Sequence, residues 1–162
     1  MVSTEYDVAI LGGGSAGYAA ARTCANAGLR TVVLEGGDKV GGLCILRGCM
    51  PTKALLYSAE VLHLIQNGAA VGVRARDVCF DIQEIIARKD KLIQEFAAYR
   101  QSQLESKNFE FIRANGSFLD PHTLQLSNGS QLRAKNFVIA TGSVIAPPPM
   151  PALQEIGYIT SD

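Results

Sequence analysis

The sequence lacks an excess of charge of either sign. Its 15 Lys and Arg residues balance 15 Asp and Glu residues, so the formal net charge is zero. A neutral chain has no overall field that attracts nucleic acid or an anionic membrane surface, so we expect neither as a partner. The sequence also lacks any apolar run near the roughly 18 to 20 residues that a membrane span needs, and we therefore expect no membrane-spanning segment.

The N-terminal segment lacks the basic region and the cleavage site of a secretory signal. It leads almost directly into a strand-like run, and we expect a cytoplasmic location. In a reducing compartment, closely spaced cysteines are more often catalytic or metal-binding than structural. We interpret Cys24 and Cys79 as small buried core residues, which leaves Cys44 and Cys49 as the pair of interest.

The length of 162 residues and a hydrophobic share of 48% are typical of one globular domain. A strand over 8–11, a helix over 18–27 and a strand over 31–34 predict a βαβ unit. Further helices are expected over 51–66 and about 82–106, and further strands over 109–112, 123–127, 130–133 and 137–140. Asn128-Gly129 indicates a hairpin turn. We therefore predict an α/β, Rossmann-like fold with a central parallel sheet and an added antiparallel hairpin or meander.

A cluster of prolines follows residue 146 and indicates an exposed connector. The chain then ends at Asp162 without a further strand or helix in its pattern. We expect from this that the sequence is cut from a longer protein.

The glycines Gly12, Gly14 and Gly17 fit G-x-G-x-x-G between a strand and a helix. In a dinucleotide site the first permits a tight turn, the second lets a pyrophosphate approach the backbone, and the third lets helix and strand pack closely. Glu35 ends the next strand, where its carboxylate can accept both hydroxyls of an adenosine ribose and would repel a 2′-phosphate. The combination favours a dinucleotide site over a glycine-rich turn without a ligand. Glu35 argues against NADP, and the motif does not separate FAD from NAD.

Cys44 and Cys49 are separated by four residues just before an expected helix. In a regular helix, Cα atoms five residues apart lie about 8 to 9 Å from each other, whereas a disulfide needs about 4.4 to 6.8 Å. The two can therefore pair only where the helix is interrupted. Gly48 permits such a bend, and Pro51 suits the first turn of the following helix. Cys49 would then lie at a helix N-terminus, a position that stabilises a thiolate, and Arg47 adds positive charge.

Three interpretations of this pair remain open from the residues alone. A structural bridge is not expected in a reducing compartment. A metal site would need further ligands, and no His or second C-x-x-C lies nearby in the sequence. A reducible, redox-active pair is favoured because a disulfide in a short, strained and exposed loop is easily reduced.

These motifs together resemble the FAD-dependent pyridine nucleotide–disulfide oxidoreductases, which include dihydrolipoamide dehydrogenase, glutathione reductase and mercuric reductase. The resemblance lies in Gly12-x-Gly14-x-x-Gly17, Glu35, Gly41-Gly42-x-Cys44-x-x-x-x-Cys49-x-Pro51-x-Lys53 and Ala140-Thr141-Gly142. It covers nearly the whole chain, and Lys53-Ala54-Leu55-Leu56 looks most like the dihydrolipoamide dehydrogenase branch. The resemblance implies that residues 1–146 form the N-terminal part of an FAD-binding domain and 147–162 a linker toward an NAD(P)-binding domain absent from this chain.

The resemblance implies that Cys49 is the charge-transfer thiolate beside the flavin and that Cys44 is the interchange thiol. Lys53 matches a lysine near flavin N5. NAD(P)H would give a hydride to the flavin, which would reduce the Cys44–Cys49 disulfide; the dithiol would then reduce a small-molecule or protein-bound disulfide of the lipoamide type, or a metal ion. Dihydrolipoamide dehydrogenases run this sequence in reverse. The positions that the resemblance assigns to FAD are Gly12, Gly14, Ser15, Ala16, Gly17, Glu35, Gly36, Gly42, Leu43, Gly48, Cys49, Lys53, Asn115, Gly116, Ala140, Thr141 and Gly142.

The chain departs from the family pattern inside the cysteine segment. Leu43 replaces the usual Thr, and Ile45, Leu46 and Arg47 replace small apolar or Asn residues. We interpret Arg47 as a solvated side chain, with the choice of an anionic substrate as the alternative. These changes bear on the substrate and not on the redox pair.

Family members also carry a second glycine loop and an interface domain with a catalytic His–Glu pair. We interpret His63 and His122 as surface or hydrogen-bonded histidines instead. We expect a homodimeric enzyme in full length and little or no turnover by this chain alone. Two other hypotheses are a stand-alone flavin- or nucleotide-binding module with redox-sensing cysteines, and an NAD-binding domain with incidental cysteines.

Overall fold

One six-stranded sheet forms the centre of the protein. The computed structural model describes residues 5–106 and 108–160. The strands lie in the order β3-β2-β1-β6-β5-β4, with the three central partners β2, β1 and β6 and the edge strand β3 all parallel. Strands β4, β5 and β6 form an antiparallel meander. The bounds are β1 (Glu5–Leu11), β2 (Thr31–Glu35), β3 (Glu110–Arg113), β4 (Gly116–Asp120), β5 (Thr123–Leu126) and β6 (Gln131–Ile139). The predicted α/β class, with a parallel centre and added antiparallel strands, is confirmed.

The parallel part of the sheet is buried on both faces, which explains the continuous apolar runs of β1 and β2. Ala9 and Leu11 pack into one cluster with side chains of β5 and β6. Ile10 packs into a second cluster with Ala21 of α1 (Ser15–Asn26). The predicted βαβ unit is thereby confirmed, and its two core clusters fix the carboxyl ends of β1 and β2.

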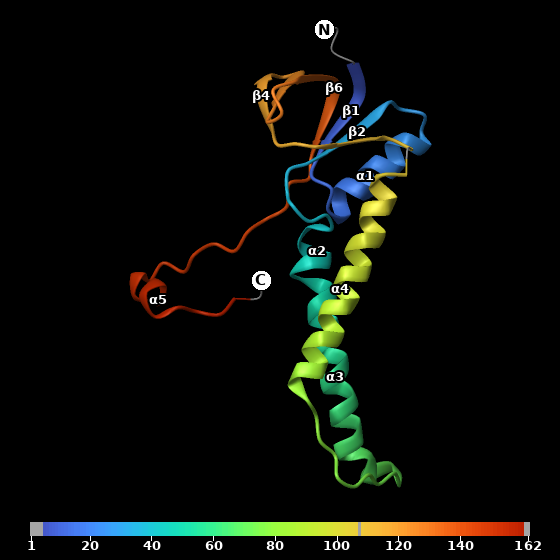
Figure 1. The fold of residues 1–162 in the computed structure, drawn as a ribbon, viewed down its shortest axis with the longest axis vertical. Helices are drawn as coiled ribbons and strands as arrows, with labels where there is room; N and C mark the ends of the chain where they lie inside the picture. The colour runs from blue at the N-terminus through green and yellow to red at the C-terminus, as the bar shows by residue number, and fades with distance from the viewer. Residues whose placement is uncertain (1–4, 107, 161–162) are drawn as a thin grey trace.

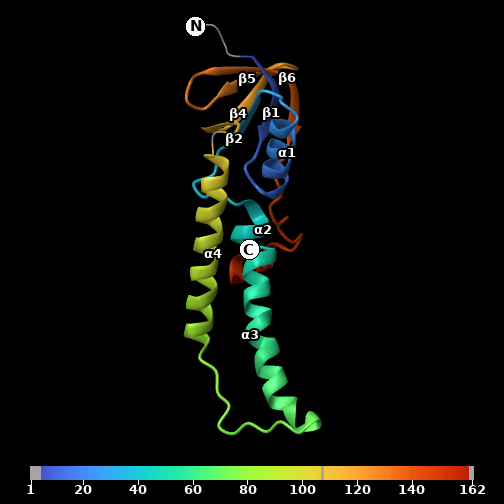
Figure 2. The same cartoon turned by 90° about the vertical axis from the view of Figure 1, so that its right-hand side faces the viewer.

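A pair of long helices projects away from the sheet (Figures 1 and 2). A short helix, α2 (Gly42–Leu46), leads into α3 (Cys49–Asn67), the 3-10 helix η1 (Gly68–Val71) and α4 (Ile82–Leu104). Arg88 of α4 donates to the carbonyl oxygen of Ala54 at 3.3 Å, and its guanidinium lies over the ring of Tyr57. The other end of α4 is anchored in the domain because Leu104 is fully buried.

Some sequence-based expectations were wrong. Cys79 is exposed rather than buried, because it lies in the irregular segment at the far end of the α3–α4 pair. The strands expected over 130–133 and 137–140 are one strand, β6, and β4 was not expected at all. Cys24 is partly buried and packs against the second core cluster, as predicted.

The hairpin at Asn128-Gly129 is confirmed by the register of β5 and β6, in which Leu124 pairs with Leu132. Beyond β6 the chain leads away from the sheet to α5 (Pro151–Ile156) (Figure 1). Most of this connector is exposed. Residues 1–4 of the predicted FAD-binding segment and residues 161–162 of the predicted linker lie outside the described residues. Among the helices that the structure describes, none combines the length and apolar character that crossing a membrane requires.

Candidate functional site

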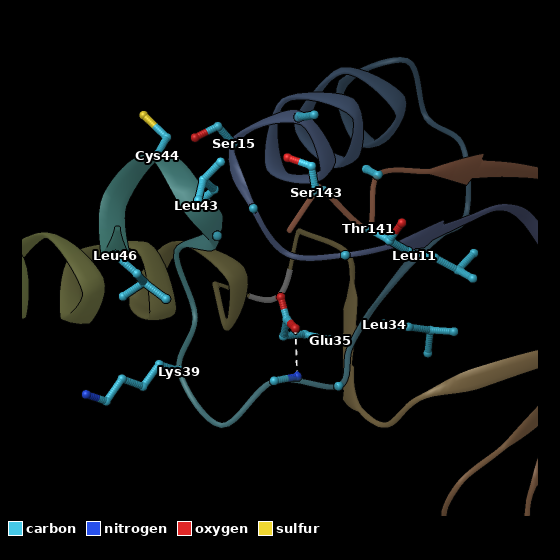
Figure 3. Close-up of a pocket in the computed structure, with 18 of the residues that line it drawn as sticks. Leu11, Ser15, Leu34, Glu35, Lys39, Leu43, Cys44, Leu46, Thr141 and Ser143 are labelled. Carbon is cyan, nitrogen blue, oxygen red and sulfur yellow. Dashed lines mark hydrogen bonds between the residues drawn. The ribbon is translucent and has the colours of Figure 1, made fainter. Parts of the chain in front are cut away.

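A cavity of about 550 Å³ lies at the carboxyl ends of β1, β2 and β6 (Figure 3). Strand β1 lies between β2 and β6, and the connections that leave these strands separate there. In open α/β sheets this is the place where ligands bind. The lining residues are Leu11, Gly12, Gly14, Ser15, Ala16, Leu34, Glu35, Gly36, Gly37, Lys39, Gly42, Leu43, Cys44, Leu46, Arg47, Gly48, Cys49, Ala114, Asn115, Gly116, Ala140, Thr141, Gly142 and Ser143.

All positions predicted to bind FAD lie on this cavity except Gly17 and Lys53. Gly17 is buried beneath the loop, where a Cβ would overlap the carbonyl oxygen of Gly12. Its predicted role in close helix–strand packing is therefore confirmed, but Gly17 does not line the cavity. Lys53 is exposed on α3, one turn beyond Cys49.

The sequence did not indicate several contacts that shape the cavity, including one made by Asn115, which was predicted only as an FAD position. Arg113, at the end of β3, donates from Nη1 to the carbonyl oxygen of Gly37 at 2.9 Å and so holds the loop after β2. The side chain of Asn115 fills the space where a Cβ of Gly36 would lie. Both contacts join segments far apart in the sequence, so no local pattern indicated them. Leu11, Leu34, Lys39, Leu46, Ala114 and Ser143 also line the cavity without having been predicted.

Glu35 is held in a fixed orientation by backbone amides. Its Oε2 accepts from the amide of Gly13 at 2.9 Å, and its Oε1 accepts from the amide of Gly37 at 2.8 Å (Figure 3 shows the second bond). A carboxylate has about four acceptor positions, so both oxygens retain capacity for a ligand's hydroxyl groups. The same negative charge opposes a phosphate at this end of the cavity.

The first turn of α1 favours negative charge, in contrast to the Glu35 carboxylate, which repels it. Gly14 is the N-cap, and no side chain caps the helix. The amides of the first helical turn have no intrahelical partner, and together with the helix dipole they favour an anion. Ser15 and Ala16 of this turn line the cavity, so one cavity combines an acceptor for hydroxyls with a position suited to a phosphate.

The two cysteines lie in different helices, as the spacing predicted. Cys44 belongs to α2 and Cys49 is the first residue of α3. The chain turns between them at Arg47 and Gly48, whose amides both donate to the carbonyl oxygen of Leu43, at 2.9 and 2.7 Å. Both cysteines are free thiols, and their side chains are within hydrogen-bonding reach of each other.

The environment raises the pKa of the Cys44 thiol above its ordinary value. The hydrogen bond with Cys49 is the largest cause, followed by burial and by the charge that Cys49 would carry. The neighbouring Ser15 hydroxyl and the positive charge of Lys53 lower this pKa and so act in the opposite direction. Cys49 therefore disfavours the thiolate of Cys44, whereas Ser15 and Lys53 favour it.

The two histidines are exposed, as predicted, and neither lines the cavity. His63 is exposed on α3, and its Nδ1 lies 3.2 Å from the side-chain nitrogen of Asn67. The Nδ1 of His122 lies 3.3 Å from the carbonyl oxygen of Ala134. Within residues 5–106 and 108–160, no group of three or more His, Cys, Asp or Glu side chains is arranged to hold a metal ion.

Comparison with known proteins places this geometry in a family. Residues 6–162 match the family model described as pyridine nucleotide-disulphide oxidoreductase. A mercuric reductase of Staphylococcus aureus is 34% identical over 97% of this chain and 28% of its own length. A dihydrolipoyl dehydrogenase of Bacillus subtilis (strain 168) is 35% identical over 99% of this chain and 36% of its own length.

A solved structure shares the fold. The Cu(II) complex of the HOCl-induced flavoprotein disulfide reductase RclA from Escherichia coli has a TM-score of 0.74 and 27% identity, and covers 91% of this chain and 31% of its own. The present chain spans about a third of the length of these relatives. With a family match from residue 6 onward, it belongs to the pyridine nucleotide-disulphide oxidoreductases.

Proposed function

We propose that this chain is the FAD-binding part of a flavin-dependent disulfide oxidoreductase in which Cys44 and Cys49 alternate between a disulfide and a dithiol. One observation carries the proposal. The two thiols lie within hydrogen-bonding reach of each other on the wall of the cavity that also contains the glycine loop and Glu35. A dinucleotide and a reducible pair of sulfurs would thus share one site.

The residues of the cavity fit FAD. Gly12, Gly14 and Gly42 contribute only backbone to its wall, the first turn of α1 offers amides to a phosphate, and Glu35 offers acceptors to ribose hydroxyls. When bound, FAD would supply two-electron chemistry, taking up a hydride and giving up an electron pair. We propose that Asn115, Gly116, Thr141 and Gly142 contact this group. Lys53, whose charge acts on Cys44, would supply positive charge at the sulfur end.

The cysteines perform the disulfide chemistry. A hydride from a reduced nicotinamide, with one further proton, converts the S–S bond between Cys44 and Cys49 into two thiols. The thiolate of Cys44 then attacks a sulfur of the substrate disulfide, forming a mixed disulfide and releasing the first substrate thiol. The thiolate of Cys49 attacks the Cys44 sulfur, which restores the S–S bond and releases the second thiol. The break in the helix at Gly48 permits both states, because it brings the sulfurs together across two helices.

The substrate that we propose first is a disulfide of the lipoamide type, small or protein-bound, for which the enzyme would be dihydrolipoamide dehydrogenase-like. Metal-ion reduction of the mercuric reductase kind is the second candidate. It is favoured by the paired free thiols of Cys44 and Cys49, since thiolates are the ligands that soft metal ions prefer. The relatives named for the two activities are equally similar to this chain, at 35% and 34% identity. A glutathione reductase-like enzyme and a stand-alone redox-sensing module are further alternatives.

Other properties of the whole protein follow from this proposal. An NAD(P)-binding domain would supply the hydride, residues 147–162 would link residues 1–146 to it, and two subunits would form a homodimer. A reducing location such as the cytoplasm would suit cysteines that must cycle. The 162-residue chain alone would then show little or no turnover.

Titration of thiols before and after dithiothreitol tests the redox pair. We expect the oxidised protein to gain a pair of thiols on reduction and Cys44→Ser to gain none. Cys79→Ser is the matched control, because Cys79 is exposed and far from the cavity, and it should gain the same pair as the unmodified protein. An unchanged gain in Cys44→Ser would contradict the proposal.

Absorbance and turnover separate the remaining alternatives. The protein reconstituted with FAD should show bound-flavin absorbance, which an NAD-binding domain would lack. In the full-length enzyme, oxidation of NADH or NADPH is compared with lipoamide and with Hg(II) as acceptors. Turnover with lipoamide supports the first candidate and turnover with Hg(II) alone supports the second. Turnover with neither, despite a reversible disulfide, favours the redox-sensing module.

A further inference from the structure

Two glycines far apart in the sequence bring the glycine loop at residues 12–17, called the dinucleotide loop below, into contact with the segment that carries Cys44. A Cβ placed on Gly42 would lie 2.8 Å from the Cα of Gly14, and one placed on Gly14 would lie 3.4 Å from the Cα of Gly42. The two backbones therefore touch without a side chain between them. Because Ser15 follows Gly14 and Cys44 follows Gly42 by two residues, this contact also brings Ser15 and Cys44 together.

The side chain of Ser15 lies beside that of Cys44 (Figure 3). Ser15 is the first residue of α1, whose N-cap is Gly14 and whose end has no side-chain cap. The Ser15 hydroxyl is thus not used in capping. It lies beside the sulfur of Cys44 instead and lowers the pKa of that thiol (Figure 3), and both side chains line the same cavity.

We propose that Ser15 is a positioning residue for Cys44: its hydroxyl donates a hydrogen bond to the sulfur, fixes the orientation of that side chain and stabilises its thiolate. The inference rests on the proposed function, in which Cys44 is the thiol that exchanges with the substrate. A residue of the dinucleotide loop would thereby set the reactivity of the redox pair.

The charges around Cys44 show why such a donor matters. Cys49 disfavours the Cys44 thiolate, because adjacent thiolates repel and because the hydrogen bond with Cys49 favours the protonated form. Burial acts in the same direction, whereas Ser15 and the cation of Lys53 oppose it. Ser15 is a neutral donor from α1, so its effect does not depend on salt as that of an exposed lysine does. The other charged groups that line this cavity or the neighbouring one beside α2 and α4 are Glu35, Lys39, Arg47 and Asp90.

The pH profile of alkylation tests this assignment. The reduced protein is treated with iodoacetamide at a series of pH values, and the labelling rates of Cys44 and Cys49 are measured separately by peptide mass spectrometry. Loss of the donor in Ser15→Ala should raise the midpoint of the Cys44 profile by about one pH unit and lower the thiolate fraction about tenfold below the midpoint. Ser15→Thr keeps a hydroxyl and should restore the original midpoint.

Ser143→Ala is the matched control, because Ser143 lines the same cavity and loses the same hydroxyl but is not a partner of Cys44. Its Cys44 midpoint should not move. An unchanged midpoint in Ser15→Ala, an equal shift in Ser143→Ala, or no rescue by Ser15→Thr would overturn the proposal. Thermal unfolding of each variant verifies that the fold is retained. The measurement uses reduced protein without FAD, so it stands apart from the disulfide titration, whose failure would instead reject the proposed function.

Discussion

Replacing Gly42 with alanine tests the contact between the dinucleotide loop and the cysteine segment. Gly42 has a φ of +64°, a left-handed conformation that costs a residue with a side chain about 1 to 2 kcal/mol. The added Cβ would lie 2.8 Å from the Cα of Gly14, whereas carbon atoms pack best at about 3.5 to 4.0 Å. Relief of this overlap should cost a further 1 to 3 kcal/mol or so, the usual range for overpacking. The free energy of unfolding should therefore fall by about 2 to 5 kcal/mol in all.

Comparison with Gly28→Ala separates the cost of the left-handed backbone from the cost of the overlap with Gly14. Gly28 has a φ of +77°, but a Cβ there would meet no atom within 4 Å. This control should lose only about 1 to 2 kcal/mol in urea denaturation and should bind FAD as the unmodified protein does. Gly42→Ala should lose more and should bind FAD at least tenfold more weakly in a fluorescence titration, because the shifted loop carries Gly14 and Ser15. Equal losses of stability and equal FAD affinity in the two variants would refute the reasoning.

Three further predictions concern Glu35 in the cavity, the core residue Leu104 and the loss of stability at alkaline pH. Glu35→Ala should weaken FAD binding about tenfold or more, since hydrogen bonds to a charged group are worth about 1.5 to 3 kcal/mol; unchanged affinity in a titration would exclude the ribose assignment. Leu104→Ala should lower the free energy of unfolding by about 2 to 5 kcal/mol, measured in urea, because this buried side chain packs beneath Gly13. Burial and a hydrogen bond to Glu110 raise the pKa of Tyr6 above its ordinary 10. A raised pKa contributes stability that is complete below pH 10 and is lost above it, so the melting temperature should fall above pH 10, and less steeply in Tyr6→Phe.

The dinucleotide loop and the break between the cysteines could be predicted because their signals are local. Gly12, Gly14 and Gly17 are each required by a turn or a close approach within one βαβ unit. The five-residue separation of Cys44 and Cys49 is incompatible with pairing in a regular helix, and Gly48 lies at the interruption. Such positions restrict the backbone whatever the rest of the fold does.

Strand β4 could not be predicted because its pattern is irregular. The register shifts between Phe118 and Asp120, which disturbs the alternation of inward and outward residues. Phe118 is largely exposed and contacts Phe137 edge to face, with ring centroids 4.9 Å apart. Strand β6 was divided in the prediction because Lys135 and Asn136 are polar, although both lie within the paired strand.

The contacts that complete the cavity depend on long-range packing. Arg113 reaches the loop after β2 only because β3 lies next to β2 in the sheet. Cys79 illustrates the same limit, since its apolar neighbours suggested burial. The segment lies at the end of a projecting helix pair, and no sequence window shows whether another element covers it.

Disulfide mapping across a series of glutathione redox buffers tests the exchange of electron pairs by Cys44 and Cys49 most directly. The protein is equilibrated at each ratio of reduced to oxidised glutathione, quenched with acid and analysed by peptide mass spectrometry. A single cross-link between Cys44 and Cys49 should appear as the buffer becomes more oxidising and should disappear reversibly on reduction. If each cysteine instead formed only a mixed disulfide with glutathione at every ratio, without a cross-linked peptide, the pair would not be the redox centre.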